Sequence, residues 1–348
     1  MRIVIATVQV PFIYGGAEYH ARNLKKALID AGYEVDIVTT LFKWYPPERI
    51  VEHILACRLL DLSESTGQAI DMLIGLRFPA YYIFHHNKVI WLLHQHREAY
   101  ELWGTEFGGL HHYPNGETIR EIIKNCDNKF LREAKKIYAN SKNVAQRLKK
   151  FNNIYAEPLY HPPPDYEKFY CDNFDNYLLF ISRLSPIKRQ HLAIEAMKLV
   201  KAPVKLIIIG SADNNNYQQY LLQLTEKNGL KEKVLFLGNI NKEQKLKLFA
   251  NALGVLFIPF DEDYGYVTLE AFYSHKPVIT CKDSGGPLEF VEDNVNGFIV
   301  LPHPETIAEA IEKLSNNIQM AKKMGKAGYE KLKALNISWK NVVTKLTQ

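Results

Sequence analysis

Residues 177–200 read YLLFISRLSPIKRQHLAIEAMKLV. The apolar run Tyr177–Ile181 predicts a strand that is buried on both faces, as in a parallel sheet covered by helices. From Arg189 to Val200, apolar side chains recur along one face of a predicted helix. The loop between them carries Arg183 and Lys188. Such a strand, loop and helix form the repeating unit of α/β proteins.

The same alternation extends in both directions from this unit. Further short apolar runs, many rich in β-branched residues, predict strands at Ile3–Val8, Val35–Thr39, Met72–Leu76, Val89–Leu93, Ile137–Ala139, Val204–Ile209, Val234–Leu237, Val255–Ile258, Val278–Thr280 and Phe298–Leu301. Amphipathic stretches predict helices between them, including Ala17–Ala31, which Gly32 would end, and Ser338–Leu346. We therefore expect an α/β protein with two doubly wound, Rossmann-like domains.

The segment His161-Pro162-Pro163-Pro164-Asp165 marks the expected boundary between these domains. Three consecutive prolines cannot continue a helix or a central strand, so the segment is predicted to be a stiff connector. A chain of 348 residues also suits two cores better than one. We expect domains at residues 1–163 and 164–331, and a C-terminal helix, about residues 332–348, that packs back onto the first domain.

The composition is that of a soluble globular protein, with 47% hydrophobic and 23% charged residues. A net charge of +5 suits anionic small molecules and argues against a nucleic-acid partner. The basic residues between Arg132 and Lys150 form the densest cluster. They indicate either a solvated helix face or a patch that contacts anionic lipid headgroups or a lipid-linked acceptor. Scattered cysteines and the absence of a leader or membrane-spanning run predict a cytoplasmic location.

Polar and glycine residues follow several of the predicted strands, where ligands bind in open parallel sheets. Gly15 and Gly16 follow the first strand and open a helix, as in an anion site or a simple tight turn. Arg183 and Lys188 flank a turn into a helix, where they could clamp a diphosphate or lie on the solvated surface. Gly210 and Asn239 also come just after strands.

Two glutamates, Glu262 and Glu270, follow the run Val255–Ile258 with seven residues between them. The second is placed at the start of a predicted helix. A carboxylate that points into a crevice accepts hydrogen bonds from vicinal hydroxyls, although acidic residues also favour helix N-termini for electrostatic reasons alone. Asp261 and Asp263 form an Asp-x-Asp triplet around Glu262, and such oxygen ligands can hold Mg²⁺ or Mn²⁺. On an extended segment both aspartates would point away from Glu262.

Together these motifs resemble the family 4 retaining glycosyltransferases of the GT-B fold. The resemblance rests on Phe180–Lys188, on the Glu262–Glu270 segment with its Tyr-Gly core, and on Ser284–Glu289 with Asn296-Gly297. The pieces occur in the expected order over nearly the whole chain. The glutamate pair is the most specific of them, and the N-terminal Gly-Gly supports it.

The resemblance implies a nucleotide diphosphate sugar, as a UDP- or GDP-sugar donor, bound in a cleft between the two domains. Arg183 and Lys188 would hold the diphosphate, which Gly16 would reach from the other domain. Glu270 would bind the ribose hydroxyls and Glu262 the donor hexose. The remaining residues expected to bind the donor are Gly15, Gly210, Asn239, Ile240, Tyr264, Gly265, Tyr266 and Val267. No separate cofactor and no metal are expected.

The resemblance also implies a histidine near the reacting sugar, at the end of the segment Val89–His94. Because the chain continues Gln95-His96, His96 is a rival for this position. The aromatic stretch Arg97–Gly104 is expected to line the acceptor side. Where many relatives have Asn-Gly-Val-Asp at the domain junction, this chain has Pro162-Pro163-Pro164-Asp165, which would stiffen the hinge.

The implied reaction transfers a hexose, with retention of configuration, to a hydroxyl of a glycan, a lipid-linked molecule or a small molecule. The acceptor would attack from the face that the nucleotide leaves, and charge stabilisation of the departing diphosphate would supply the catalysis. Two alternatives share the two-domain plan: a nucleotide-sugar epimerase and a non-catalytic binding module. A dehydrogenase is disfavoured because the Gly15-Gly16 turn lacks the Gly-x-Gly-x-x-Gly fingerprint. Peripheral membrane contact would involve the N-terminal domain.

Overall fold

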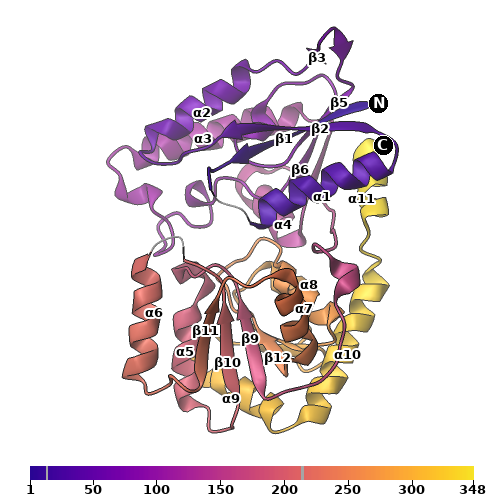
Figure 1. The fold of residues 1–348 in the computed structure, drawn as a ribbon. Coiled ribbons are helices and arrows are strands. Elements are labelled where there is room, and N and C mark those ends of the chain that lie inside the picture. The colour runs from indigo at the N-terminus through magenta and orange to yellow at the C-terminus, as the bar shows by residue number, and fades with distance from the viewer. Residues whose placement is uncertain (13–14, 213–214) are drawn as a thin grey trace. The chain divides into compact units, whose positions relative to one another are not determined.

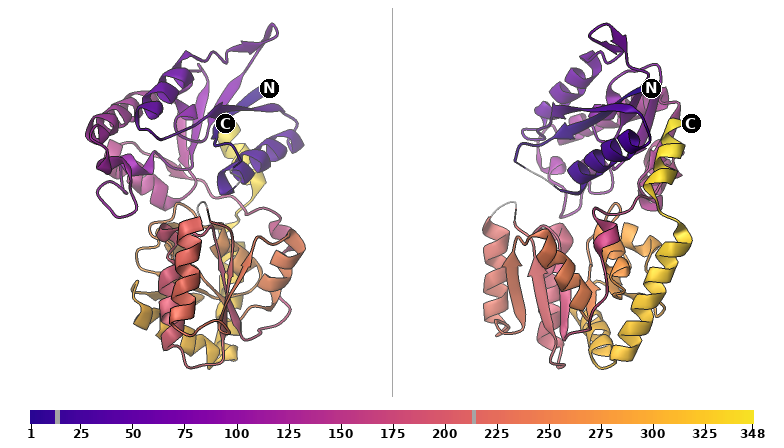
Figure 2. Two further views of the ribbon diagram at one scale, coloured as in Figure 1. Left: turned by 60° about the vertical axis from the view of Figure 1, so that its left-hand side comes forward. Right: turned by 45° about the vertical axis from the view of Figure 1, so that its right-hand side comes forward.

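The computed structural model describes residues 1–12, 15–212 and 215–348. The chain divides into two compact units. Unit 1 comprises residues 1–164 and 338–348, and unit 2 comprises residues 165–337. The chain therefore leaves unit 1 after Pro164, builds the whole of unit 2, and returns to unit 1 at Ser338. Each unit is an α/β structure with helices on both faces of a parallel sheet (Figures 1 and 2), which confirms the predicted fold class.

The sheet of unit 1 has six parallel strands in the order β2-β1-β5-β6-β7-β8. Their bounds are β1 Arg2–Gln9, β2 Glu34–Leu41, β5 Met72–Gly75, β6 Lys88–Leu92, β7 Lys136–Ala139 and β8 Glu157–Pro158. The helices are α1 Gly16–Asp30, α2 Glu48–Leu59, α3 Gly116–Phe130, α4 Lys142–Asn152 and α11 Trp339–Thr347. A small hairpin, β3 Glu64–Ser65 and β4 Gln68–Ala69, lies outside this sheet.

Alternating strand residues of unit 1 enter two separate hydrophobic clusters, because successive side chains of a strand point to opposite faces. Ile5, Ile74 and Trp91 pack with α1 and α11, whereas their neighbours pack with α2, α3 and α4. The second cluster includes Ala6, Leu73 and Ile90 from the strands and Ile54, Ile123 and Leu148 from the helices. Burial on both faces explains why these strands are continuous apolar runs in the sequence.

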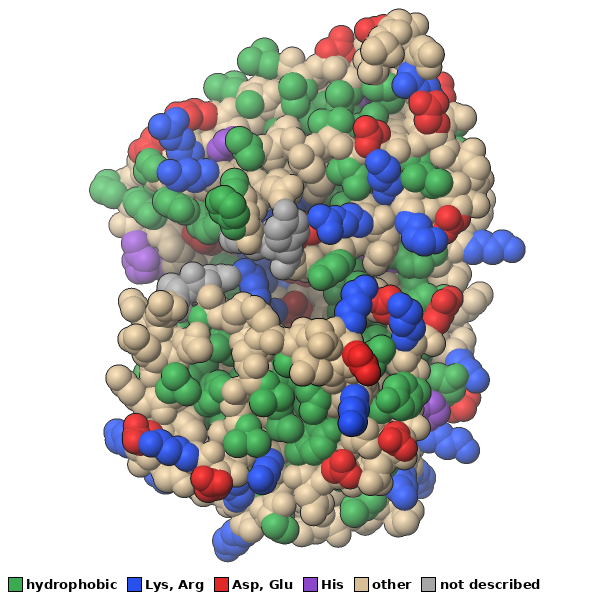
Figure 3. Space-filling view, in the orientation of Figure 1, with side chains coloured by type: hydrophobic (Ala, Val, Ile, Leu, Met, Phe, Trp, Pro, Cys, Tyr) green, Lys and Arg blue, Asp and Glu red, His purple; other side chains and the backbone are tan. Residues whose placement is uncertain are grey.

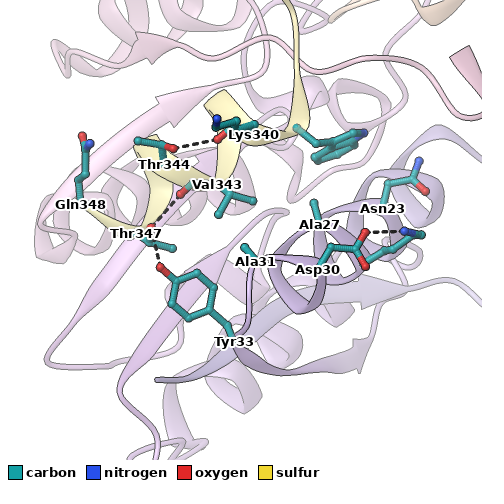
Figure 4. Close-up of a pocket in the computed structure, with 12 residues that line it drawn as sticks. Asn23, Ala27, Asp30, Ala31, Tyr33, Lys340, Val343, Thr344, Thr347 and Gln348 are labelled. Atoms are coloured by element: carbon teal, nitrogen blue, oxygen red, sulfur yellow. Dashed lines mark hydrogen bonds and ion pairs between the residues drawn. The ribbon is translucent and has the colours of Figure 1, made fainter. Parts of the chain in front are cut away.

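The C-terminal helix α11 completes one face of unit 1 by packing beside α1. Its Val342, Val343 and Leu346 are buried in the cluster shared with α1. The Tyr33 hydroxyl, just after α1, lies 3.3 Å from the hydroxyl of Thr347 (Figure 4). A groove of about 690 Å³ lies between the two helices and is also lined by Tyr33.

Unit 2 has a second parallel sheet of six strands, in the order β11-β10-β9-β12-β13-β14. The strands are β9 Tyr177–Ile181, β10 Lys205–Ile209, β11 Val234–Gly238, β12 Gly254–Leu256, β13 Val278–Cys281 and β14 Gly297–Val300. The helices are α5 Gln190–Leu199, α6 Asn215–Lys227, α7 Lys242–Asn251, α8 Tyr266–Tyr273, α9 Pro304–Ser315 and α10 Ile318–Leu335. The largest hydrophobic cluster joins the strands to α5, α6, α9 and the start of α10.

Candidate functional site

The strand order of unit 2 reverses direction between β9 and β12. In open parallel sheets such a reversal leaves a crevice at the carboxyl ends of the two strands, where ligands bind. The loops that leave these strands are residues 182–189 and 257–265, and they lie side by side, because the backbone N–H of Phe260 donates to the carbonyl of Ile187 at 2.8 Å. Lys188 and Glu262, predicted from the sequence to act in one site, come from these two loops.

Lys188 and Glu262 form an ion pair through Nζ and Oε2. Their side chains are 15% and 21% exposed, so the pair is sheltered but still reachable from solvent. Lys188 ends a short 3-10 turn, Pro186–Lys188, that bridges β9 and α5. The structure thus brings the two predicted residues into direct contact, each neutralising the other.

A third loop, after β13, holds the Glu262 segment in place. The backbone N–H groups of Asp261 and Glu262 donate to the carbonyls of Asp283 and Ser284 at 2.8 and 2.9 Å, and the N–H of Gly286 donates to the carbonyl of Glu262. A Cβ at Gly286 would lie 2.7 Å from the carbonyl oxygen of Tyr264, so this close approach requires glycine. Since both the N–H and the carbonyl of Glu262 bond to the loop after β13, the backbone at Glu262 is held by that loop.

Arg189 ties the first loop to the third. Its guanidinium donates to both carboxylate oxygens of Asp283, at 2.8 and 2.7 Å. Two parallel bonds of this kind fix geometry better than a single ion pair does. Arg189 was not predicted, because nothing in the sequence distinguishes it from the neighbouring Lys188.

Glu270 is buried, with 3% of its surface exposed. Its Oε1 accepts from Nζ of Lys245, on α7, at 2.6 Å. Its Oε2 is buried and has no hydrogen-bond partner among the described residues. A buried carboxylate oxygen without a donor is costly, and it calls for an additional donor such as a ligand hydroxyl. Lys245 was not predicted as a site residue.

Two local expectations about this segment were wrong. Glu270 is not at the start of its helix, because Gly265 adopts a left-handed backbone (φ +84°) and α8 already begins at Tyr266. Asp261 is not in an extended backbone, because its φ is +43°, so a simple alternation of side chains across Asp261–Asp263 does not apply. No cluster of three or more metal-ligating side chains occurs within residues 1–12, 15–212 and 215–348.

The other predicted donor-binding residues of unit 2 lie at the carboxyl ends of its strands. Arg183 is exposed in the loop after β9. A Cβ at Gly210 would lie 1.9 Å from the carbonyl oxygen of Ser182, so this glycine also serves the packing of two loops. Asn239 is exposed just after β11. The rest are Ile240, next to it, and Tyr264, Gly265, Tyr266 and Val267, which form the loop end and first turn of α8.

In unit 1, the strand order changes direction between β1 and β5, and the predicted Gly15 and Gly16 open the helix after β1. The N–H of Gly15 donates to Oε2 of Glu18 at 2.7 Å. The other oxygen of Glu18 lies 3.4 Å from Arg77, which follows β5. This pair was not predicted, since Glu18 and Arg77 are far apart in the chain.

His94 and His96 have different surroundings. His94, two residues beyond the end of β6, is half-buried, and its Nδ1 lies 2.6 Å from the carbonyl oxygen of Gln95. His96 is 9% exposed and packs against the rings of Phe42 and Phe78. Burial, with a smaller contribution from His94, lowers the pKa of His96 to about 3. His96 is therefore a neutral core residue, which favours His94 in the functional position.

A buried carboxylate lies beneath this segment. Asp127, on α3, is fully buried and accepts hydrogen bonds from Tyr81, Tyr82, Tyr100 and the side chain of Gln95. Tyr100 belongs to the stretch that was expected to line the acceptor side, and this tyrosine is part of the core. We call Asp127 with its four donors the Asp127 cluster.

Two family models match successive parts of the chain. The model "Glycosyltransferase Family 4" matches residues 14–161, and "Glycosyl transferases group 1" matches residues 168–331. The chain belongs to the family 4 glycosyltransferases. Both matches follow the division into the two units, since one ends before Pro164 and the other begins after Asp165.

Two curated relatives are similar to this glycosyltransferase in sequence. Alpha-1,3/1,6-mannosyltransferase ALG2 of Homo sapiens is 33% identical over 196 residues, which cover 53% of this chain. The match spans less than half of the human protein, 45% of its length. The uncharacterized glycosyltransferase MJ1607 of Methanocaldococcus jannaschii is 25% identical over 90% of this chain and 89% of its own length.

A solved structure confirms the GT-B fold of this glycosyltransferase. Anabaena HepE, crystallised with UDP-glucose, matches with a TM-score of 0.73 at 19% identity, covering 100% of this chain and 98% of HepE. No helix in the described part of the glycosyltransferase combines the length and the apolar character that a bilayer crossing requires.

Proposed function

We propose that this glycosyltransferase transfers a hexose from a nucleotide diphosphate sugar to a hydroxyl of a glycan, lipid-linked or small-molecule acceptor, with retention and without a metal ion. The observation that carries the proposal is the buried Oε2 of Glu270, which lacks a donor at the same sheet edge as the Lys188–Glu262 pair. The vicinal hydroxyls of a ribose are donors of the required kind. The name of the human relative supports mannose as the hexose.

In this proposal, Lys188 changes its ion-pair partner when the donor binds. A diphosphate oxygen replaces the Glu262 carboxylate on Nζ, and Arg183 provides a second cation on the same loop. The released Glu262 accepts from hydroxyls of the sugar. Both cations then neutralise the negative charge that grows as the diphosphate leaves, which is the largest contribution a protein makes to such a reaction. Since two cations already serve the leaving group, a metal ion is not required.

His94 contributes a hydrogen-bond acceptor. Its Nδ1 faces a carbonyl oxygen and must donate to it, so whenever the ring is neutral, Nε2 is the acceptor nitrogen. We propose that Nε2 accepts from a hydroxyl of the transferred sugar and so orients it for attack by the acceptor.

The function is tested by product analysis. The protein is incubated with GDP-mannose, UDP-glucose or an ADP-sugar, with and without an oligosaccharide panel, and nucleoside diphosphate release and the anomeric configuration of the product are followed by NMR. We expect release that depends on the acceptor, with the donor's configuration kept. Conversion of the donor without acceptor would indicate an epimerase instead, and binding without turnover, a binding module.

Peripheral contact with a membrane is the part of the proposal that concerns location. The residues after α3 and along α4 include exposed cations that could meet anionic lipid at the cytoplasmic face. They are Arg132, Lys135, Lys136, Lys142 and Lys150, whereas Arg147 is buried beside Glu101. On the face drawn in Figure 3, basic and acidic side chains are interspersed. Co-sedimentation with phosphatidylserine but not phosphatidylcholine vesicles would support this contact.

A further inference from the structure

We propose that Gln95 and Asp127 are positioning residues that hold His94 with its ring proton on Nδ1. The proposal rests on the function proposed for His94, and it adds how the fold sets the chemical form of that ring. It begins from the contact of 2.6 Å between Nδ1 and the carbonyl oxygen of Gln95. A carbonyl oxygen can only accept, so the contact exists only when Nδ1 carries a proton.

The carbonyl of Gln95 is held in place through the side chain of the same residue. The buried amide nitrogen of Gln95 donates to Oδ2 of Asp127 at 2.7 Å and to Oδ1 of Asn152 at 3.0 Å. Both N–H groups of the amide are therefore used, and a flipped amide would set its oxygen against the Asp127 carboxylate. With its side chain fixed at two points, Gln95 has little freedom to turn its own peptide group.

Asp127, which accepts from the Gln95 side chain, is itself held by several hydrogen bonds. It accepts from the Tyr81 and Tyr82 hydroxyls at 2.9 and 2.7 Å, and from the Tyr100 hydroxyl at 2.7 Å. These tyrosines follow β5 and β6, whereas Asp127 lies on α3. Three segments of unit 1 thus meet at one carboxylate, and four donors offset much of the cost of burying it. Burial still raises the pKa of Asp127.

The neighbouring contacts restrict the segment from the other side. His96 is packed among the rings of Phe42 and Phe78, so the chain is anchored on both sides of the Gln95 peptide. A core that only stabilised unit 1 would not need a polar anchor at Gln95, because an apolar side chain could fill the same volume. The hydrogen bonds of the Gln95 side chain have a function if the carbonyl of Gln95 must face His94.

The tautomer of His94 is read directly by two-dimensional NMR of the ring nitrogens in protein labelled with ¹⁵N-histidine. His94→Gln assigns the signal by its loss. We expect wild-type protein to show His94 protonated on Nδ1 only, and Gln95→Leu to show a mixture of both neutral tautomers. With this change kcat should fall by about tenfold to a hundredfold, the scale for losing the hydrogen-bond partner of a metal-binding histidine, at an unchanged donor KM.

Tyr138→Phe is the matched control, because it removes a buried hydroxyl of the same unit that donates to the carbonyl of Lys345 instead. It should lower the melting temperature without changing the tautomer or kcat. Tyr100→Phe, which removes one donor to Asp127, is the milder test if Gln95→Leu does not fold, and it should give a smaller population of the second tautomer.

Two results would overturn the proposal: wild-type His94 protonated on Nε2, or a folded Gln95→Leu protein that keeps the Nδ1 tautomer alone. Failure of the proposed function gives a different result. In that case His94→Gln would retain full transfer activity, while the tautomer measurements would still come out as expected.

Discussion

The two units share one architecture but hold their functional loops by different means. Unit 1 fixes the segment around His94 with a buried carboxylate and neutral partners, the Asp127 cluster. Unit 2 fixes its loops with backbone hydrogen bonds and the Arg189–Asp283 ion pair. Its Lys188 and Glu270 each form an ion pair with another residue of opposite charge. In the proposed function, the segment around His94 keeps its contacts when the donor binds, whereas Lys188 of unit 2 changes its partner.

The largest effect is expected at Lys188. Lys188→Ala should lower turnover by about 10²–10³, the scale for losing one group that stabilises developing charge. The loss should appear in kcat, and a melting curve checks that the protein is still folded, since the Lys188 side chain is only 15% exposed. Lys198→Ala, which removes an exposed lysine from α5 of the same unit, is the control and should leave kcat unchanged. Full turnover in folded Lys188→Ala would mean that the ion pair is only structural.

His94→Ala tests the contribution of unit 1. We expect transfer to fall by about 10²-fold, in the range for a group that handles a proton or a critical hydrogen bond, while nucleotide affinity stays normal. His96→Ala should do the reverse. It leaves a cavity among Phe42 and Phe78, so it should lower thermal stability more than it lowers activity. Steady-state kinetics and melting curves of both variants decide between the histidines, and the opposite outcome would reassign the role to His96.

Glu270→Gln should weaken binding of the free nucleoside diphosphate by about 1.5–3 kcal/mol, the range for hydrogen bonds to a charged group. Calorimetry measures this directly, with Glu309→Gln on the exposed face of α9 as the matched control. Unchanged affinity would remove Glu270 from the ribose and leave its buried Oε2 without an explanation.

Acid should destabilise unit 1 before unit 2. Burial lowers the pKa of His20 and of His96 to about 3. Between pH 6.5 and about 3 the unfolded chain therefore binds more protons, and stability falls as the pH falls, by about 1.4 kcal/mol per pH unit for each histidine. The raised pKa of Asp127 acts in the opposite direction, near that carboxyl's own titration. In unit 2, burial lowers the pKa of His275, which is only half-buried.

This acid sensitivity can be measured by fluorescence, because all four tryptophans belong to unit 1. They are Trp44, Trp91, Trp103 and Trp339. At pH 4 to 5 the melting transition seen by tryptophan fluorescence should precede that seen by far-UV circular dichroism, and at pH 7.5 the gap should narrow. Transitions that coincide at every pH would show that the units do not differ in this respect.

The smallest expected effect is that of a chelator. EDTA should leave the transfer rate unchanged, and Mn²⁺ should not raise it, because Lys188 and Arg183 supply the charge that a metal ion would bring. A preparation silenced by EDTA and rescued by Mn²⁺ would show that unit 2 uses Asp261 and Asp263 as ligands and not the Lys188–Glu262 exchange.

The strands were predictable because burial on both faces leaves a clear signal. Tyr177–Ile181 matches β9 residue for residue. The run Val255–Ile258 overestimates β12, which ends at Leu256, because the chain leaves the ladder while it is still buried. Apolar character in the sequence indicates that a residue is buried, but it does not indicate that its backbone pairs with another strand.

It was also predictable that Lys188 and Glu262 lie at one edge of the sheet, since both follow strands whose carboxyl ends meet there. Their partners were not predictable. Lys188 and Glu262 are 74 positions apart, and Asp127 meets tyrosines from two other segments. Such contacts depend on how loops fold over one another, and no local pattern encodes that. The placement of Glu270 failed for a related reason, because a single left-handed glycine, Gly265, shifted the helix start.

The return of the chain to unit 1 at Ser338 has a consequence for its synthesis. Residues 1–164 emerge from the ribosome long before α11 is synthesised. The apolar face that Val342, Val343 and Leu346 will cover therefore stays uncovered while all of unit 2 is made. Unit 2 is continuous and can fold on emergence, but unit 1 can be completed only after α11 has been made. The nascent N-terminal half is thus the part of this protein most in need of a chaperone.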